Sequence, residues 1–170
     1  RGLGDVYKRQ DLDIAIQGVI DGMRYTRQGQ ACTAGSRVYI QEKIYDKVMN
    51  GVVEKLSKLK MGNALDEVSD IGAIISEEQL KRTLHYMDIA KQTSSAKVVH
   101  GGNQPTGGDY KNGFFYEPTL MSGVPVDSPV CQEEIFGPVA CAIPFKTFEE
   151  VMQSANDTPF GLSAVLWTQN

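Results

Sequence analysis

Residues 11–40 read DLDIAIQGVIDGMRYTRQGQACTAGSRVYI, and this stretch passes through three patterns in turn. Apolar residues first recur every three or four positions, which predicts an amphipathic helix that begins at the capping residue Asp11 and ends near Arg27. Small and polar residues then fill 29–36, and the short apolar run Val-Tyr-Ile at 38–40 predicts a strand. A helix joined to a strand by one tight loop indicates an α/β fold.

The same alternation continues along the rest of the chain. We expect further helices at residues 43–59, from a Ser76 cap to about 92, and from a Thr147 cap to about 156. We expect further strands at residues 96–99, 114–120, 140–145 and 162–167, the last of them buried. Helices that alternate with short apolar or β-branched strands are typical of an α/β domain with a mainly parallel sheet and flanking helices.

The composition argues against several classes of function. The chain has 170 residues, enough for one domain with a core, and its formal net charge of −4 argues against a dedicated nucleic-acid binder. No apolar run is long enough to span a membrane and no signal peptide opens the sequence, so we expect a cytoplasmic protein that binds neither nucleic acid nor membrane. The cysteines and histidines lack the spacing of a metal site, so no metal is expected.

Cys32 is the most informative single residue. Its neighbours in 29–36 are all small or polar, so a substrate carbonyl can approach the sulfur while backbone N–H groups face the developing oxyanion. A thiol there can attack an aldehyde to form a thiohemiacetal, which loses hydride to leave a thioester that water cleaves. A free cysteine is more often an inert core residue, which is how we interpret Cys141 in its apolar strand. Cys131 has no visible activating group.

A second motif, QEEIFGPV, occupies residues 132–139. Two adjacent carboxylates precede Phe136, Gly137 and Pro138, and this combination predicts a rigid turn because proline fixes its φ angle. Taken alone, the motif is also consistent with a solvated acidic turn that leads into a strand.

Both motifs resemble those of one enzyme family. Residues 25–36, YTRQGQACTAGS, are similar to the active-site cysteine signature of the aldehyde dehydrogenases, and residues 132–139 are similar to the Glu-Glu-Ile-Phe-Gly-Pro motif of that family. The resemblance extends over residues 11–170 and implies a partial catalytic (thiol) domain of the aldehyde dehydrogenase fold. It implies that Cys32 is the nucleophile of an NAD(P)-dependent enzyme that oxidises an aldehyde to a carboxylic acid.

The resemblance also implies cofactor contacts. Glu134 matches the carboxylate that accepts hydrogen bonds from the nicotinamide ribose, and Phe136 matches the aromatic residue that packs beside the nicotinamide. Gln79 and Arg82 match positions that can contact the cofactor ribose, although a polar pair at this spacing is usually a solvated helix face. The expected cofactor is NAD or NADP, the substrate is a small aldehyde, and the parent enzyme is a homo-oligomer, either a dimer or a tetramer.

Several parts of the family's machinery have no counterpart in this sequence, among them the Glu-Leu-Gly-Gly motif with its general base and the glycine turn that contacts the cofactor phosphates. We therefore expect that the chain alone does not oxidise aldehydes. Residues 1–10 show no periodicity, and we interpret them as a non-native leader or scar. Residues 11–170 are then expected to be a domain truncated at both ends.

Two alternatives are open at this point. A different thiol-dependent acyl-transfer enzyme would need a histidine base, and neither His85 nor His100 is obviously placed for that role. A non-catalytic structural or oligomerisation segment would need neither a reactive thiol nor a cofactor. A requirement for nicotinamide cofactor distinguishes the dehydrogenase from both.

Overall fold

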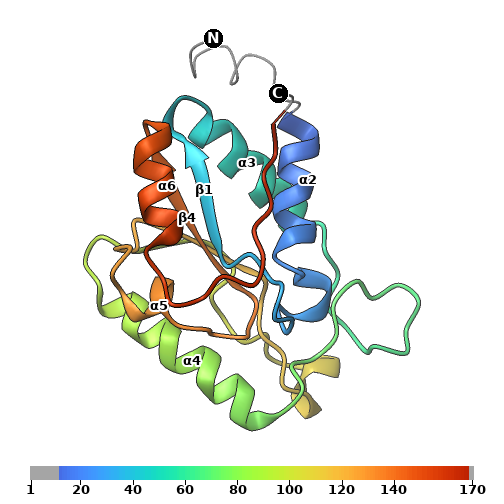
Figure 1. The fold of residues 1–170 in the computed structure, drawn as a ribbon. Coiled ribbons are helices and arrows are strands. Elements are labelled where there is room, and N and C mark those ends of the chain that lie inside the picture. The colour runs from blue at the N-terminus through green and yellow to red at the C-terminus, as the bar shows by residue number, and fades with distance from the viewer. Residues whose placement is uncertain (1–11, 169–170) are drawn as a thin grey trace.

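The structure is a computed structural model that describes residues 12–168 (Figure 1). Its elements in chain order are α2 (Leu12–Gly22), the 3₁₀ turn η1 (Tyr25–Arg27), β1 (Arg37–Gln41), η2 (Glu42–Ile44), α3 (Tyr45–Leu56), α4 (Glu77–Gln92), β2 (Lys97–His100), η3 (Gly108–Asn112), β3 (Thr119–Ser122), α5 (Pro129–Gln132), β4 (Val139–Phe145) and α6 (Phe148–Asn156). The capping role of Asp11 and the leader interpreted at residues 1–10 lie outside the described residues.

The four strands form one sheet in the order β1-β4-β3-β2. β4 is central and pairs in parallel with β1 on one side and with β3 on the other, so that Cys141 lies opposite both Arg37 and Met121. β2 pairs with β3 in the antiparallel sense and forms one edge of the sheet. The predicted α/β fold with a mainly parallel sheet is therefore confirmed, and β2 is its antiparallel exception.

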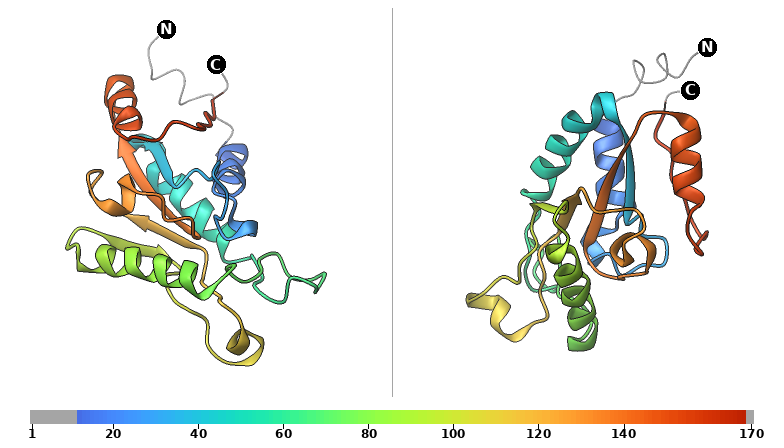
Figure 2. Two further views of the ribbon diagram at one scale, coloured as in Figure 1. Left: turned by 60° about the horizontal axis from the view of Figure 1, so that its bottom comes forward. Right: turned by 90° about the vertical axis from the view of Figure 1, so that its left-hand side faces the viewer.

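Helices cover both faces of this sheet, and Figure 2 shows α4 and the pair α2 and α3 on opposite sides of the strands. Successive side chains of a strand point to opposite faces. In β4, Val139, Cys141 and Ile143 join the apolar cluster beneath α4 and α5, whereas Ala140 and Ala142 join the cluster beneath α2 and α3. The central strand is therefore buried on both faces, which explains its uninterrupted apolar sequence.

Two predicted helix caps are confirmed. The Ser76 Oγ accepts a hydrogen bond from the Gln79 backbone N at 3.2 Å, and the Thr147 Oγ1 accepts one from the Glu150 backbone N at 3.2 Å. These bonds satisfy N–H groups of the first turn, so α4 and α6 begin where the sequence predicts. The first predicted helix is interrupted instead, because Arg24 adopts a left-handed conformation (φ 57°) between α2 and η1.

The strand predicted at 114–120 is wrong over most of its length, since β3 begins only at Thr119. The backbone before it bonds to loops and not to a neighbouring strand. The Phe114 carbonyl accepts from the Ile74 N at 2.9 Å, and the Glu117 N donates to the Asn103 carbonyl at 3.0 Å. Pro118 has no N–H to donate, so a regular ladder cannot extend through it.

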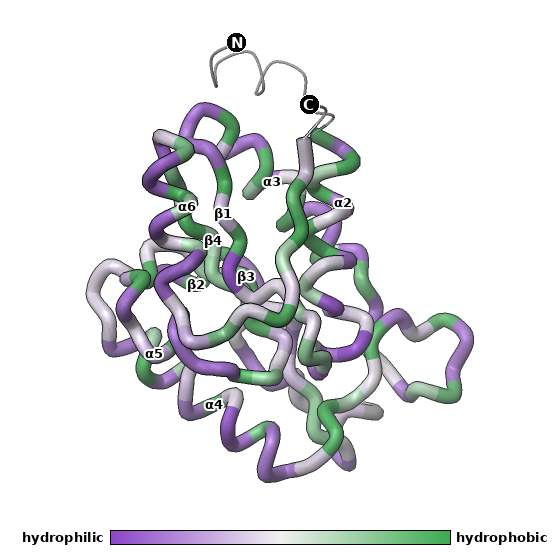
Figure 3. The backbone as a smooth tube through the Cα atoms, viewed as in Figure 1, coloured by the Kyte–Doolittle hydropathy of each residue, from purple (hydrophilic) through white to green (hydrophobic). Residues whose placement is uncertain are grey.

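The buried strand predicted at 162–167 is also wrong. No described residue pairs with this segment, and Leu162 and Leu166 are 69% and 84% exposed. Figure 1 shows the segment running beside α2, and Figure 3 shows that part of it is apolar. Apolar residues favour a strand only where a neighbouring strand accepts their backbone hydrogen bonds. Within residues 12–168, no strand lies beside the segment at 162–167.

No helix within residues 12–168 is long and apolar enough to cross a membrane. Over the same range, no group of three or more His, Cys, Asp or Glu side chains could hold a metal ion.

Candidate active site

The thiol loop, residues 29–36, connects η1 to β1 and carries an exposed Cys32. Gly29 opens the loop with a φ of +63°, and the preceding Gln28 is left-handed as well. The loop is closed by a bond from the Gly35 N to the Gly22 carbonyl at 2.9 Å. Within residues 12–168 the backbone N–H groups of Cys32 and Thr33 donate to no acceptor, so two donors remain beside the sulfur.

Two buried polar side chains anchor the entrance of the thiol loop. The Gln28 side-chain amide donates to the carbonyl of Gly72 at 2.6 Å and to that of Tyr116 at 3.4 Å. The Tyr25 hydroxyl donates to the Thr119 carbonyl at 2.9 Å, and burial raises its pKa far above the ordinary value. The sequence alone does not predict either anchor, because its only signal for them is their position inside the cysteine motif.

The acidic turn, residues 132–138, begins at the last residue of α5 and leads into β4. Phe136 is held in a left-handed conformation (φ 58°), which costs energy for a residue with a bulky side chain. Gly137 faces α4 so closely that a Cβ atom there would lie 2.3 Å from the Thr83 Oγ1. The turn therefore requires both its unusual backbone and its glycine.

Helix α4 holds the backbone of the acidic turn through side chains on one face. The Gln79 amide nitrogen donates to the carbonyls of Ile135 and Phe136, each at 2.9 Å. Arg82 Nε donates to the Glu134 carbonyl at 3.1 Å. Gln79 and Arg82, predicted as cofactor contacts, thus lie against the turn that carries Glu134 and Phe136.

The neighbouring carboxylate has a different environment. The Tyr86 hydroxyl donates to the Glu133 carboxylate at 2.6 Å, and burial together with this hydrogen bond raises the pKa of Tyr86. The exposed Glu134 carboxylate has no partner among residues 12–168, so it is available to an outside ligand. The sequence alone predicts no role for Glu133, and the structure shows that its carboxylate connects the turn to α4.

The thiol loop and the acidic turn meet at one small, open pocket. Cys32 lines it together with Glu134 and Phe136, although the two motifs are far apart in the sequence. The backbones touch where a Cβ atom on Gly29 would lie 2.2 Å from the Gly137 carbonyl oxygen. Three of the five predicted site residues thus line one pocket, and the other two support its wall from α4.

Neither histidine lines this pocket. His85 is on α4, and His100 ends β2, where burial lowers its pKa. The other two thiols are buried, which leaves Cys32 as the exposed cysteine. The pocket therefore combines an accessible sulfur, an unpaired carboxylate and an aromatic side chain, without a histidine base.

Residues 5–170 match the aldehyde dehydrogenase family. The chain is 40% identical to an NADP-dependent D-glyceraldehyde dehydrogenase of Picrophilus torridus over 97% of the chain and 33% of that protein. It is 34% identical to a betaine aldehyde dehydrogenase of Bacillus subtilis, again over 97% of the chain and 33% of that protein. The fold matches a betaine aldehyde dehydrogenase of Staphylococcus aureus in complex with NAD+, with a TM-score of 0.90 and 34% identity, over 95% of this chain and 32% of that one.

The chain therefore spans about a third of the length of the relatives that it matches. Family membership follows from a match over nearly all of its residues, supported by the same fold at 34% identity. The chain belongs to the aldehyde dehydrogenase family.

Proposed function

We propose that this chain supplies the nucleophile and one cofactor-facing wall of an enzyme that oxidises an aldehyde to a carboxylic acid with NAD or NADP. The observation that supports this most directly is the shared pocket of Cys32, Glu134 and Phe136. Relatives named as NADP-dependent or solved with NAD+ support the choice of cofactor.

Cys32 is the proposed nucleophile. Its thiolate attacks the aldehyde carbon, a carbon–sulfur bond forms, and the carbonyl electron pair moves to oxygen. The N–H groups of Cys32 and Thr33, which have no acceptor among the described residues, are the proposed donors to that oxyanion. Hydride then leaves the carbon, and water cleaves the resulting thioester to release the acid and restore the thiol.

The acidic turn is the proposed binding surface for the nicotinamide end of the cofactor, which when bound supplies the hydride acceptor. A free carboxylate fits a ribose diol because it can accept two O–H bonds, and Glu134 is unpaired and lines the pocket. Phe136 offers an aromatic face on the same wall. Gln79 and Arg82 are then cofactor contacts only at the edge of this surface, since their described bonds go to the turn itself.

The test uses the full-length protein that contains this chain. Cys32→Ala is expected to abolish NAD(P)H formation with a panel of aldehydes, because no other described thiol reaches the surface. The matched control is Ser94→Ala, an exposed residue after α4, which should retain the parent rate. Dehydrogenase activity that survives Cys32→Ala would overturn the assignment of the nucleophile.

We infer that the 170-residue chain alone does not turn over aldehydes. Its pocket has no titratable side chain besides Cys32 and Glu134 among the described residues, and a missing general base costs about 10²–10⁴ in rate. NAD(P)H formation is measured with the purified chain beside the full-length protein. Clear turnover by the chain alone would contradict this inference and would point to Glu134 as a base.

Two alternative functions are distinguished by the same measurements. A thiol-dependent acyl-transfer enzyme would act without nicotinamide cofactor, but neither histidine lines the pocket to serve as its base. A structural or oligomerisation segment would tolerate Cys32→Ala. The proposal includes a homo-oligomer, as the family resemblance implies, and keeps the cytoplasmic location expected in the sequence analysis. Analytical ultracentrifugation of the full-length protein measures its assembly state.

A further inference from the structure

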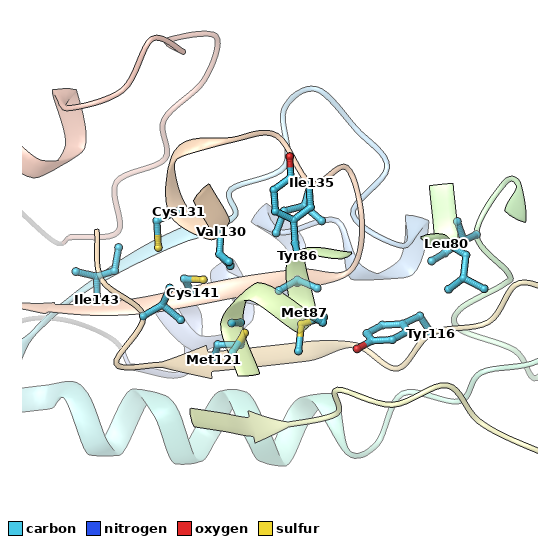
Figure 4. Close-up of a cluster of buried hydrophobic side chains, with 14 residues drawn as sticks. Leu80, Tyr86, Met87, Tyr116, Met121, Val130, Cys131, Ile135, Cys141 and Ile143 are labelled. Carbon is cyan, nitrogen blue, oxygen red and sulfur yellow. The ribbon is translucent and has the colours of Figure 1, made fainter. Parts of the chain in front are cut away.

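Two cysteines that the proposed mechanism does not use lie side by side in the core. Cys131 is on the short helix α5 and Cys141 is on the central strand β4, with exposed fractions of 5% and 2%. Both belong to the apolar cluster beneath α4, and Figure 4 shows their sulfur atoms facing the same space between Val130 and Ile143. The sequence places them ten positions apart, so only the fold brings them together.

The two thiols differ in acidity because of their surroundings. The adjacent Cys141 thiol lowers the pKa of Cys131, and the nearby Arg37 guanidinium acts in the same direction. The adjacent Cys131, together with burial, raises the pKa of Cys141. Cys131 is therefore the more acidic thiol of the pair.

The two cysteines also flank the acidic turn in the sequence. Cys131 immediately precedes Gln132, and Cys141 is the third residue of β4, directly after the turn. A covalent bond between the two sulfurs would close a small ring around the segment that carries Glu134 and Phe136. Sulfur atoms in a disulfide are about 2 Å apart, closer than two thiols that are not bonded can approach, so forming the bond must draw α5 toward β4.

We propose that Cys131 and Cys141 form a reversible intramolecular disulfide when the protein meets a hydroperoxide, and that this modification shifts the acidic turn. The Cys131 thiolate attacks the peroxide oxygen, which gives a sulfenic acid and releases water or an alcohol. The Cys141 thiol then displaces the sulfenic hydroxyl as water. The two thiols lose two electrons and two protons in all, and the peroxide is the oxidant that takes them up.

The test uses the purified chain with Cys32→Ser, so that only the two buried thiols are present. After hydrogen peroxide treatment, neither thiol should be alkylated in denaturant. Mass spectrometry should detect a disulfide between the peptides that contain Cys131 and Cys141. Dithiothreitol should restore both thiols. A native iodoacetamide pulse before oxidation should leave both thiols unlabelled, which shows that the chain stayed folded.

The unsubstituted chain should give the same joined peptides with Cys32 still outside the bond, so the result does not depend on one variant folding. In Cys141→Ser, dimedone should trap the sulfenic acid at Cys131, whereas in Cys131→Ser it should not label Cys141. Three outcomes would each overturn the proposal. Both thiols could still react with the alkylating reagent after oxidation, Cys131 could be over-oxidised while Cys141 stays a thiol, or disulfides could form only between chains.

Hydrogen exchange measures the effect on the acidic turn. Oxidation should change the exchange rates of residues 133–137 and leave those of α3 unchanged, and identical rates in both redox states would disprove the coupling. These measurements need neither aldehyde nor cofactor. Their failure would leave the proposed dehydrogenase function intact, and loss of that function would leave the disulfide intact.

Discussion

At Gly29 the thiol loop touches the acidic turn directly. Its φ of +63° is a conformation that residues with a side chain rarely adopt, and its missing side chain leaves room for the Gly137 carbonyl. One residue thus meets two separate requirements, a backbone that bends toward Cys32 and a close approach between the two motifs. The position of the sulfur relative to Glu134 depends on that contact.

Gly29→Ala is expected to destabilise the chain by about 1–3 kcal/mol, because alanine would be strained at this φ and would clash with the Gly137 carbonyl. Urea denaturation of the purified variant measures the loss. The matched control is Gly22→Ala, where an added Cβ meets no atom within 4 Å and no stability should be lost. Equal stability of the two variants would contradict the proposed contact.

Among the elements, α4 has the most specific relation to the site. Its buried face packs in the core through residues such as Leu80 and Met87, as Figure 4 shows, while Gln79 and Arg82 bond to carbonyls of the acidic turn. A left-handed backbone at a residue such as Phe136 persists only where surrounding contacts stabilise it. The Gln79 amide supplies such contacts, because it donates to the carbonyls of Phe136 and Ile135. The helix therefore determines the shape of the acidic turn from behind.

Gln79→Met keeps the length of the side chain and removes both donors. We expect faster hydrogen exchange in residues 133–137, a loss of about 1–3 kcal/mol in stability, and a higher cofactor KM in the full-length protein. Lys81→Met is the control on the same helix, since it removes only an exposed ion pair with Glu77 and should cost about 0–0.5 kcal/mol. If both variants behave alike, Gln79 does not position the turn.

At the scale of the whole molecule, the segment after α6 returns across the fold to lie beside α2 (Figure 1). Trp167 packs so closely on the helix that a Cβ atom on Gly18 would lie 2.1 Å from its Cε2 atom. The Ser163 hydroxyl also donates to the Thr33 carbonyl of the thiol loop at 3.4 Å. The segment after α6 is thus held against α2 and contacts the loop that carries Cys32.

Gly18→Ala should displace Trp167 from α2, because the added methyl group occupies the space of the indole ring. Trp167 is the single tryptophan, so its fluorescence reports the change directly. We expect emission at longer wavelength and stronger quenching by acrylamide, while the helix itself gains about 0.5–1 kcal/mol from alanine. Gly22→Ala on the same helix does not contact the indole ring and should leave the emission unchanged. A similar spectrum in both variants would show that Trp167 does not pack on Gly18 in solution.

The sequence by itself determined what depends on neighbouring residues. The helix caps at Ser76 and Thr147 are local hydrogen bonds between a side chain and a nearby N–H, and the structure confirms both. The apolar run of β4 predicted a strand in a mainly parallel sheet, with Cys141 as a core residue. The two motifs indicated the family, which the comparisons confirm, while the roles of Cys32 and of the cofactor residues stay predictions.

Only the tertiary structure decided which distant residues meet. The segment at 162–167 has the composition of a strand, yet a strand exists only where another backbone accepts its hydrogen bonds, and no described residue does so. The bonds from Gln79 to the acidic turn and the contact between Cys131 and Cys141 likewise follow from how α4, α5 and β4 pack. No local pattern encodes such contacts, because their energy depends on the burial and geometry of partners that the chain brings together only when it folds.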